Sequence, residues 1–475
     1  MIISWQTIAK AKNLAISVVP MRELNLATRI DAEHYQPHFI AVLDLVKRKE
    51  HKKLSEVVSK SVTTGHTPSM SDETFYGGDV KFIKTDNLRD NHIVEDFSHY
   101  LSDKGANKLK NALLREDDII ITIIGATYDV VGRVARIFSD LGRAAINQNI
   151  SLVRPSIASG YLACFLMGKY GKQQLYYLSR QTEQVNLNNA EVADVLVPIA
   201  NENFVNKIHA LHNETHHLYL SSKKLYAEAE RLLLKEINLE EYRINDELIS
   251  IRNLSECLAD NRFDAEYWQP KYEKLIAKMT KSKTLGQIAK IKRGSLINPS
   301  YYSDKGVPYI RGADFSKNEL DDVGMVYVSS DFNRTREVVV DKGDIVFASI
   351  GSVGKTALVT EKYKKSYISN NIGKISLTDK TYIPQYVQIC LQSILGQSQL
   401  ERLQTQTAQP KISDADIAKI LIPSISKEKQ EEISELAEQA REMKRKSQYL
   451  LNKVKRAVEI FVEQSERQAL QYLET

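Results

Sequence analysis

The sequence predicts an α+β fold that is built twice. It consists of two tandem homologous α/β domains, each followed by a long helix, and the two helices form an antiparallel coiled coil. Three observations lead to this prediction: an opening segment recurs 233 positions later, strand-like runs follow each copy in the same order, and each half ends in a helix with the same heptad spacing. A repeat this long indicates a duplicated domain rather than a solenoid, whose units are about 20–50 residues long.

The repeat begins with the opening segment. It reads Arg29-Ile30-Asp31-Ala32-Glu33-His34-Tyr35-Gln36-Pro37 in the first copy and Arg262-Phe263-Asp264-Ala265-Glu266-Tyr267-Trp268-Gln269-Pro270 in the second. Further matches follow in unbroken order: Phe82-Ile83-Lys84 with Tyr309-Ile310-Arg311, Asp118-Ile119-Ile120 with Asp344-Ile345-Val346, Gly132-Arg133 with Gly354-Lys355, Asn149-Ile150 with Asn371-Ile372, Thr182-Glu183-Gln184 with Thr407-Ala408-Gln409, and Leu196-Val197-Pro198 with Leu421-Ile422-Pro423. Because the order never breaks, each half is repeated as a whole.

Short runs rich in Ile and Val, bounded by Gly, Asn or Asp, predict the strands of each half. They are Val80–Lys84, Asp118–Ile124, Val134–Phe138 and Ile150–Val153, and then Val307–Arg311, Asp344–Ile350, Thr356–Thr360 and Gly373–Leu377. One helix is expected over Tyr161–Leu178 and another over Pro384–Leu403.

The long helices carry the most regular pattern. Residues that form a seam are spaced alternately three and four apart, which is typical of a coiled coil. Asn201 and Ser426 are suited to cap the two N-termini. The seam residues are Ile208, Leu211, Thr215, Leu218, Ser222, Leu225, Ala229 and Leu232 in the first helix, and Ile433, Leu436, Ala440, Met443, Ser447, Leu450, Val454 and Ala457 in the second.

Each seam helix has at least about 25 residues and is therefore roughly 40 Å long. An alternative is that each helix packs on its own domain, but that does not explain why both copies keep the same seam. We expect the helices to pair and to act as a spacer. The expected boundaries are a first domain at 1–198, a first spacer helix at 199–240, a second domain at 241–423 and a second spacer helix at 424–475.

Composition sets limits on the class of protein. Hydrophobic residues make up 43% and charged residues 26% of the 475 residues, as in ordinary globular proteins. No apolar run is long enough to span a membrane, and Met1-Ile2-Ile3-Ser4-Trp5-Gln6 does not resemble a secretory signal, so a cytoplasmic location is expected. The three cysteines form no close pair, and Cys164 and Cys390 lie in matching apolar stretches where buried thiols are expected.

Charge is distributed unevenly along the chain. The net charge is only +5, but between Lys281 and Gly312 the only acidic residue is Asp304. Basic side chains neutralise phosphates and tyrosines stack or donate hydrogen bonds, so this segment suits a nucleic-acid surface; the alternative is a solvated basic face. The basic residues are Lys281, Lys283, Lys290, Lys292, Arg293, Lys305 and Arg311, and the interleaved tyrosines are Tyr301, Tyr302 and Tyr309.

Several motifs suggest chemistry without meeting its requirements. Gly351-Ser352-Val353-Gly354-Lys355-Thr356 ends like a phosphate-binding loop, but Ser349 stands where that loop needs its first glycine, so a strand–turn–strand is expected. Asn298-Pro299-Ser300-Tyr301 is one residue away from the Asn-Pro-Pro-Tyr motif of adenine methyltransferases, and no glycine-rich cofactor motif precedes it. We therefore predict no catalytic residue and no cofactor in this chain.

Three histidines have the spacing of a helical metal site. His212, His216 and His217 lie within two turns of the first long helix, and His212 and His216 could hold zinc together. The second copy has no equivalent histidines, and no HExxH frame is present. We expect a solvated helix face here and no metal.

Taken together, these motifs resemble the DNA specificity subunit of Type I restriction-modification enzymes. The resemblance is carried by the paired Arg-x-Asp-Ala-Glu openings, the Asp-Ile-(Ile/Val)…Ile-Gly hairpins, the Gln turns before Leu-x-Pro and the two heptad helices, and it covers nearly the whole chain. It implies two target-recognition domains that read the halves of a bipartite, asymmetric DNA site. It also implies a non-catalytic subunit whose partners are double-stranded DNA, two adenine methyltransferase subunits and, through the complex, the restriction and translocase subunits.

On this basis we predict two sets of DNA-contacting residues. Lys and Arg are expected mostly at phosphates, and Asn, Gln and some Arg at base edges. The first set is Lys84, Asn87, Arg89, Arg133, Gln148 and Asn149, and the second is Lys292, Arg293, Tyr301, Tyr302, Arg311, Lys355 and Asn371. Asn149 and Asn371 match between the copies, so a role in capping a turn is the stronger expectation for both.

Three other functions compete with this one. The first, in the same recognition class, is a specificity protein that serves a different defence or methylation system. A coiled-coil adaptor without direct DNA readout would explain the seam but not the duplicated domains. A fused nuclease or methyltransferase lacks the motifs that such chemistry requires. The divergent loops between the copies are where sequence specificity is expected, and the repeated frame is where partner docking is expected.

Overall fold

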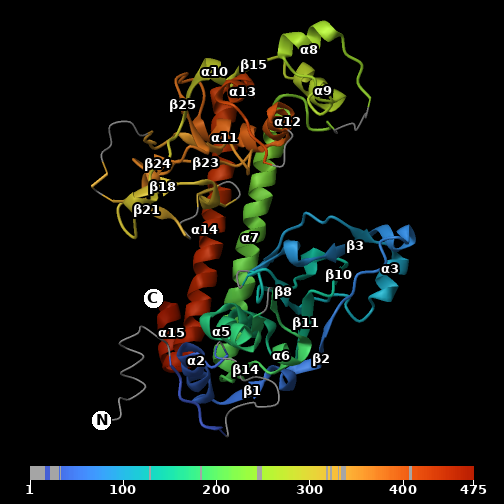
Figure 1. The fold of residues 1–475 in the computed structure, drawn as a ribbon, viewed down its shortest axis with the longest axis vertical. Helices are drawn as coiled ribbons and strands as arrows, with labels where there is room; N and C mark the ends of the chain where they lie inside the picture. Colours follow the sequence, from blue (N-terminus) through green and yellow to red (C-terminus); the bar gives the residue numbers. More distant parts are fainter. Residues whose placement is uncertain are drawn as a thin grey trace. The chain divides into compact units, whose positions relative to one another are not determined.

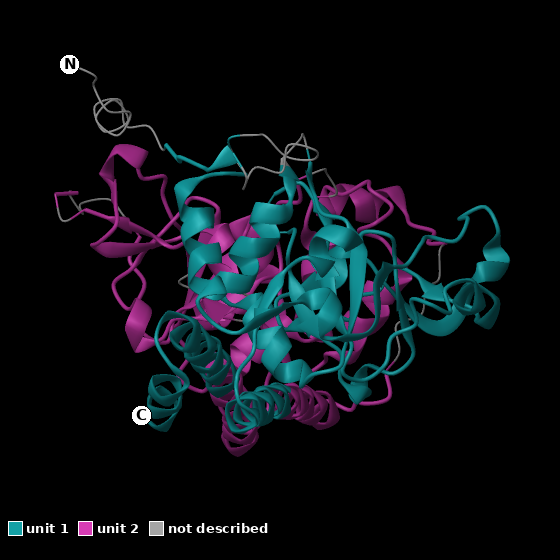
Figure 2. Cartoon of the chain, turned by 90° about the horizontal axis from the view of Figure 1, so that it is seen from below, with its two compact units in different colours: residues 1–219, 445–475 teal, residues 220–444 magenta. Residues whose placement is uncertain are grey.

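The computed structural model describes residues 16–21, 32, 34–127, 130–181, 184–242, 249–316, 319–320, 324–329, 331–332, 338–405 and 409–475. The chain divides into two compact units (Figure 2). Unit 1 comprises residues 1–219 and 445–475, and unit 2 comprises residues 220–444. Each long helix therefore contributes residues to both units. Figure 1 shows the elements along the chain.

Unit 1 contains the first copy of the repeat. Its strands are β1 (His51–Lys53), β2 (Val58–Thr64), β3 (Tyr76–Ile83), β4 (Leu88–Arg89), β5 (His92–Ile93), β6 (Tyr100–Leu101), β7 (Ile119–Thr122), β8 (Ile124–Gly125), β9 (Val134–Arg136), β10 (Ala144–Ile146), β11 (Ile150–Pro155), β12 (Arg180–Gln181), β13 (Val185–Asn186) and β14 (Leu196–Pro198). Its shorter helices are α2 (Pro37–Lys47), α3 (Asp103–Lys108), α4 (Ser159–Met167), α5 (Lys169–Leu178), α6 (Asn189–Ala193) and α15 (Glu466–Glu474).

Unit 2 contains the second copy. Its strands are β15 (Ser282–Thr284), β16 (Ala289–Arg293), β17 (Tyr302–Ser303), β18 (Val307–Ile310), β19 (Phe315–Ser316), β20 (Glu319–Leu320), β21 (Val326–Val328), β22 (Ile345–Ala348), β23 (Thr356–Leu358), β24 (Tyr367–Ile368), β25 (Ile372–Leu377) and β26 (Leu421–Pro423). Its shorter helices are α8 (Leu254–Asp260), α9 (Pro270–Lys278), α10 (Leu285–Ile288), α11 (Pro384–Gln392), α12 (Ile394–Leu403) and α13 (Asp414–Lys419).

The central sheet has the same topology in both units. Its order is β2-β11-β7-β9 in unit 1 and β16-β25-β22-β23 in unit 2, with antiparallel neighbours throughout. A second sheet in each unit contains one parallel pair, β3 with β10 and β18 with β24. The 351–356 segment is the turn of the β22–β23 hairpin, so the strand–turn–strand prediction is confirmed.

The central sheets are buried on both faces, which explains why their strands are apolar in succession. In unit 1, Ile119 and Ile121 pack against the helices, whereas Ile120 packs against the second sheet. In unit 2, Ile345 packs against the helices and Val346 packs against the second sheet. The central sheet of each α+β region thus separates two hydrophobic cores, and unit 2 has a further small cluster formed by Ile297, Tyr309, Val328 and Tyr367.

The helices expected over Tyr161–Leu178 and Pro384–Leu403 are each broken into two, so the prediction of single helices is wrong in both copies. Gly168 and Ser393 have extended backbone and begin the second helix of each pair. Gly171 and Gly396 allow that helix to turn back closely, because a Cβ at either position would overlap backbone of the preceding helix. Apolar periodicity continues through these tight breaks, which is why the sequence pattern missed them.

The long helices are α7 (Glu202–Glu236) and α14 (Lys427–Glu463), and they pack against each other within each unit. In unit 1 the Phe204 and Phe461 ring centroids are 5.5 Å apart, and the Ser447 hydroxyl donates to the Thr215 carbonyl at 2.7 Å. Residue numbers rise along α7 as they fall along α14, so the pairing is antiparallel. The eight seam positions of each helix follow the same order of buried and half-buried side chains.

The repeated frame is held by the same hydrogen bonds in both copies. Tyr161 and Tyr386 donate to the carbonyls of Pro198 and Pro423, at 2.7 and 2.9 Å. The Gln174 side chain exchanges two hydrogen bonds with the backbone of Leu196, and Gln399 does the same with Leu421. These bonds fix the Leu-x-Pro strand that leads into each long helix. Among the described helices, none has the length and apolar character needed to cross a bilayer.

Candidate nucleic-acid interface

In unit 1 the strand registers gather the predicted residues at one end of the sheets. Ile150 pairs with Thr122, and Val134 pairs with Ile121, so Asn149 and Arg133 both lie just beyond paired strand ends. Ile83 pairs with Ile146, which places Lys84 and Gln148 at the same end.

In unit 2 the same geometry recurs. Arg293 pairs with Gly373, Ala348 with Ile372, and Phe347 with Thr356, so Arg293, Asn371 and Lys355 lie at one end of the central sheet. Ile310 pairs with Ile368, which brings Arg311 to that end as well. We call the corresponding surface of each unit its sheet-end surface: Lys84, Arg133, Gln148 and Asn149 in unit 1, and Arg293, Arg311, Lys355 and Asn371 in unit 2.

Two predicted residues of unit 1 are built into a turn. Lys84 precedes the 3₁₀ helix Thr85–Asn87, its backbone N–H donates to Asn87 Oδ1 at 3.0 Å, and its ammonium group lies 2.9 Å from His99 Nδ1. Asn87 is only 5% exposed, and its amide donates to the carbonyls of Val94 and Asp96. All polar atoms of the Asn87 side chain are therefore used to shape the turn between β4 and β5.

Two arginines of unit 1 meet at one acceptor. Arg89 Nη1 donates to the Leu88 carbonyl at 2.9 Å, and Arg133 Nη1 donates to the same carbonyl at 3.2 Å. Arg89 also donates to the carbonyl of Asp86. Two guanidinium groups at a single neutral oxygen concentrate positive charge at this point of the sheet-end surface.

Two arginines of unit 2 are held by carboxylates. Arg293 donates to Asp414 from Nε at 2.9 Å and from Nη2 at 2.6 Å, and also to the Ile412 carbonyl. Arg311 contacts the buried Asp314, whose carboxylate also accepts from the Arg311 N–H at 2.7 Å. Arg311 and Asp314 occupy the positions that Lys84 and Asn87 occupy in unit 1. Both arginines therefore stabilise the frame around the surface.

The other predicted residues of unit 2 reach solvent more freely. Lys292, Lys355 and Asn371 are exposed, and neither lysine has a carboxylate partner among the described residues. Tyr301 is 41% exposed, with its ring edge-on to Phe332, and Tyr302 is half-buried beside Tyr309. Lys290, which we did not include in the predicted set, projects from the same face of β16 as Lys292 and is equally exposed. Strand alternation was the signal that could have identified it.

Asn149 and Asn371 make equivalent backbone hydrogen bonds in their turns, whereas the side-chain cap in the first turn comes from Asn147, whose Oδ1 accepts from the Asn149 N–H at 3.1 Å. The Asn149 carbonyl accepts from the Ile123 N–H at 2.9 Å, and the Asn371 carbonyl accepts from the Ser349 N–H at 2.9 Å. Gln148, next to Asn149, is exposed and accepts a hydrogen bond from the Thr67 hydroxyl at 2.6 Å. Backbone geometry at Asn149 and Asn371 therefore belongs to the frame, whereas the neighbouring side chains differ between copies.

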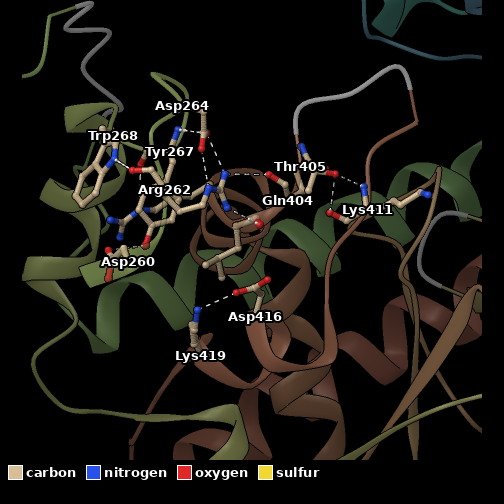
Figure 3. Close-up of polar contacts among 12 residues, drawn as sticks. Asp260, Arg262, Asp264, Tyr267, Trp268, Gln404, Thr405, Lys411, Asp416 and Lys419 are labelled. Atoms are coloured by element: carbon tan, nitrogen blue, oxygen red, sulfur yellow. Dashed lines mark hydrogen bonds and ion pairs between the residues drawn. The ribbon is translucent and has the colours of Figure 1, made fainter. Parts of the chain in front are cut away.

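The opening segment of the second copy is a clamp of stacked side chains (Figure 3). The Tyr267 ring lies between the guanidinium groups of Arg262 and Arg402, at 4.4 and 4.3 Å. Arg262 pairs with Asp264 and donates to the carbonyls of Leu403 and Gln404. This segment therefore anchors the start of α9 to the end of α12. In the first copy, Arg29, Ile30, Asp31 and Glu33 lie outside the described residues, as do Thr182, Glu183, Thr407 and Ala408 of the Gln turns.

A pocket of about 530 Å³ borders this clamp. It is lined by basic and acidic side chains together, among them Arg262, Arg293, Lys411, Asp264 and Asp416. Its charges are largely paired internally: Arg262 with Asp264, and Asp416 with Lys419 at 2.8 Å. The arrangement suits a structural junction better than a site for a charged ligand.

The prediction of a solvated histidine face on α7 is wrong for His212 and His216, whereas His217 is exposed. His212 is fully buried, its Nε2 lies 2.7 Å from Asn91 Oδ1, and Arg136 Nη1 lies 3.3 Å from its Nδ1. His216 stacks on Phe138, with ring centroids 3.6 Å apart, and contacts Asp140. Burial, followed by the charge of Arg136, lowers the pKa of His212 to about 3. These contacts are long-range, so helical spacing alone could not reveal them.

Among the described residues no cluster of His, Cys, Asp or Glu could hold a metal ion. Cys164 and Cys390 are buried, as the sequence predicts, and burial raises the pKa of each thiol to about 12. A thiol with so high a pKa is a poor nucleophile at neutral pH. The two cysteines therefore fill the cores of their units.

Comparison with known proteins gives one family match. Residues 277–453 match the family model described as the Type I restriction modification DNA specificity domain. Among solved structures, the chain is similar to the S subunit of a Type I restriction-modification system from M. genitalium, with 14% identity, 87% of this chain and 95% of that chain covered, and a TM-score of 0.39. It is also similar to the HsdS subunit from Thermoanaerobacter tengcongensis, with 14% identity, 88% and 96% covered, and a TM-score of 0.28. No curated protein matches.

Proposed function

We propose that this chain is a non-catalytic DNA specificity subunit of a Type I restriction-modification system, and that its two α+β regions read the two halves of one bipartite, asymmetric DNA site; the match of residues 277–453 to the family model supports this. In this proposal the recognition domains are residues 1–198 and 241–423, and the spacer is formed by α7 and α14 within residues 199–240 and 424–475. The second segment is not one helix, because α14 ends at Glu463 and α15 follows from Glu466. The complex would act in the cytoplasm, on double-stranded DNA.

The observation that carries the proposal is the pair of sheet-end surfaces. Each copy holds the same frame with the same hydrogen bonds, and each presents a different set of polar side chains at the equivalent sheet end. Two similar frames with different surface chemistry suit two half-sites with different sequences.

Within these surfaces the residues divide by role. We propose that Arg89, Arg133, Gln148, Lys292 and Lys355 contact DNA directly, because they carry the exposed or concentrated charge and amide groups. Asn87, Arg293 and Arg311 would act by holding the surface in shape. Tyr301 and Tyr302 would pack against sugar or base, and Asn149, Asn371 and Lys84 would set the turns and add backbone contacts.

Partner docking would use a second repeated feature. Ile16-Ser17-Val18 and Ile249-Ser250-Ile251 occupy equivalent positions before the two opening segments. The apolar side chains are exposed in both: Ile16 36% and Val18 81%, and Ile249 81% and Ile251 92%. An exposed apolar segment kept in both copies suits two copies of one partner protein. We propose that this partner is the adenine methyltransferase subunit, and that it brings the restriction and translocase subunits into the complex.

The experiment that tests the function is methylome sequencing of cells that express this chain with its partner methyltransferase. We expect one split, asymmetric motif, with adenine methylation that depends on this chain. Methylation without sequence preference would instead support the coiled-coil adaptor, and an uninterrupted motif would contradict the bipartite site.

A second test measures charge at the surface of unit 2. Lys290→Ala with Lys292→Ala should weaken DNA binding by the complex, and should reduce the slope of log K against log salt by about 0.9 for each phosphate that the protein no longer neutralises. Lys52→Ala, which removes an exposed lysine of β1 outside the sheet-end surface, is the matched control. An unchanged slope in the double variant would remove both lysines from the interface.

A further inference from the structure

We propose that Leu296 in unit 2 and Met70 in unit 1 are specificity-determining residues that contact the C5-methyl groups of thymines in the major groove. This inference rests on the proposed function and adds the chemistry that each domain reads. Both side chains are large, apolar and exposed, Leu296 by 71% and Met70 by 54%, and both lie in the loop that leaves the edge strand of a central sheet.

The loop of unit 2 is pinned on both sides of Leu296. Before it, the Gly294 N–H donates to the Ile372 carbonyl at 2.9 Å, and the Ser295 N–H donates to the Ile368 carbonyl at 3.1 Å. After it, Ile297 is only 1% exposed, and its N–H lies 3.2 Å from the Tyr309 hydroxyl, which itself donates to the Ser295 carbonyl. Leu296 is thus held outward by a backbone that is fixed at each neighbour.

The end of the loop is fixed as well. Asn298 caps the short helix Pro299–Tyr301, its side chain accepting from the Ser300 N–H at 3.0 Å. The Tyr301 carbonyl accepts from the Ser329 N–H, which ties the loop to the second sheet. Burial of a large apolar side chain is favourable, so a leucine that could turn inward would bury itself. Here the surrounding contacts keep it exposed.

A glycine brings both loops to the same place. Gly65 follows β2 and Gly294 follows β16, and a Cβ at either position would overlap a backbone carbonyl, that of Ile146 or that of Ile368. These carbonyls end the equivalent strands β10 and β24, which lead into the turns that contain Gln148 and Asn371. Each loop therefore crosses closely over the sheet-end surface of its unit before it reaches Met70 or passes through Leu296.

The loop of unit 1 is similarly tied down on both sides of Met70. The Thr67 hydroxyl donates to Gln148, and the carbonyl of the buried Pro68 accepts from the Tyr76 hydroxyl at 2.7 Å. Beyond Met70, the Asp72 N–H donates to the Ser69 carbonyl. Met70 therefore lies three positions after Thr67, the residue whose hydroxyl contacts Gln148, a predicted base-reading residue.

The chemistry around these side chains favours a base edge as their partner. An isolated exposed leucine needs no explanation. Along the chain, however, Leu296 lies between Lys292 on β16 and Lys305, both exposed and without a carboxylate partner among the described residues. Cations before and after the loop can bind phosphates and bring the apolar side chain to the groove, where the thymine methyl group is the apolar feature that distinguishes base pairs.

The test uses the complete complex with its methyltransferase, and DNA in which thymines of the second half-site are replaced one at a time by deoxyuridine. This change removes only a methyl group. Wild-type complex should lose affinity about fourfold at one such position, as expected for one buried methyl. With Leu296→Ala the same replacement should have no further effect, which is the coupling expected of residues in contact. Met70→Ala should abolish the effect in the first half-site only.

Tyr449→Ala is the control, because it truncates a side chain of similar exposure on α14. If wild-type complex shows no split-site specificity, the proposed function fails and not this inference. If specificity is present, three results each overturn the inference: no thymine in the half-site, insensitivity to every deoxyuridine, or an unchanged methyl effect in Leu296→Ala. A loss of methyltransferase binding by Leu296→Ala would also overturn it, by assigning the loop to a protein partner.

Discussion

Equivalent residues in the two copies fall into two classes. Some make the same contact twice, such as Tyr161 with the Pro198 carbonyl and Tyr386 with the Pro423 carbonyl, at 2.7 and 2.9 Å. Others occupy equivalent backbone positions but carry different side chains with different roles, as in the turn that contains Gln148. Residues of the first class set the frame, so their substitution should change stability. Residues of the second class should change recognition instead.

Gly65 and Gly294, which let the two loops pass close to a backbone carbonyl, give a prediction about stability. Gly294→Ala should lower the free energy of unfolding by about 1–3 kcal/mol, because the new Cβ meets the Ile368 carbonyl, which is backbone and cannot rotate away. Gly312→Ala is the matched control, since no atom lies within 4 Å of a Cβ there. Urea unfolding of the three proteins measures the difference, and equal losses in both variants would contradict the explanation.

The buried histidine gives a pH dependence. His212 has a folded-state pKa of about 3, against 6.5 for the ordinary value. Below pH 6.5 the unfolded chain binds a proton that the folded protein does not, so stability falls as the pH falls from about 6.5 to 3. The expected slope from this group is about 1.4 kcal/mol per pH unit.

His209 and His216 shift in the same direction, through burial, and add to the wild-type slope. The informative quantity is therefore the difference between wild type and His212→Gln, measured by urea unfolding between pH 7.5 and 5. The slope of the free energy of unfolding against pH should be smaller in the variant by about 1.4 kcal/mol per pH unit, which is the contribution of one proton. Parallel pH profiles would show that His212 is protonated in the folded state.

At the scale of elements, each α+β region is organised around one sheet with two cores, and each long helix is organised around one seam. The order of burial along the seam is the same in α7 and α14. Polar seam residues interrupt the apolar surface at Thr215 and Ser447: the Ser447 hydroxyl donates to the Thr215 backbone carbonyl, and the Thr215 hydroxyl donates to the His212 carbonyl. Such a bond lowers the cost of burying the two polar groups.

Truncation of the seam should destabilise the unit that contains the residue. Ile208→Ala in unit 1 and Ile433→Ala in unit 2, both fully buried, should each cost about 2–5 kcal/mol. Lys207→Ala and Glu435→Ala, exposed neighbours on the same helices, serve as controls. Thermal unfolding followed by calorimetry should show the loss; tolerance of both isoleucine variants would mean that the seam contributes little.

For the whole molecule, the proposed function makes the long helices responsible for the distance between the half-sites. Deletion of one heptad from both helices keeps the seam in register and shortens each by about 10 Å. We expect the methylated motif to keep both half-sites and to lose up to about three base pairs from its gap, at 3.4 Å per pair.

Methylome sequencing of the deletion variant measures this change. Deletion from one helix alone is the control, because it breaks the register of the seam and should reduce complex formation. An unchanged gap after the paired deletion would refute the spacer role, whereas new half-site sequences would mean that the helices also shape the recognition domains.

The sequence by itself determined the duplicated frame, the α+β class and the heptad helices, because these follow from repeats and periodicities that are local along the chain. Only the tertiary structure decided which candidate side chains remain available. Strand register gathers Arg133, Gln148 and Lys355 at sheet ends, buries Asn87 in a turn and ties Arg293 to Asp414. The tertiary structure also buries His212 of α7. The contacts of Asn87 lie within nine positions along the chain, but the other outcomes depend on contacts between residues tens of positions or more apart, which no spacing along a helix or strand encodes.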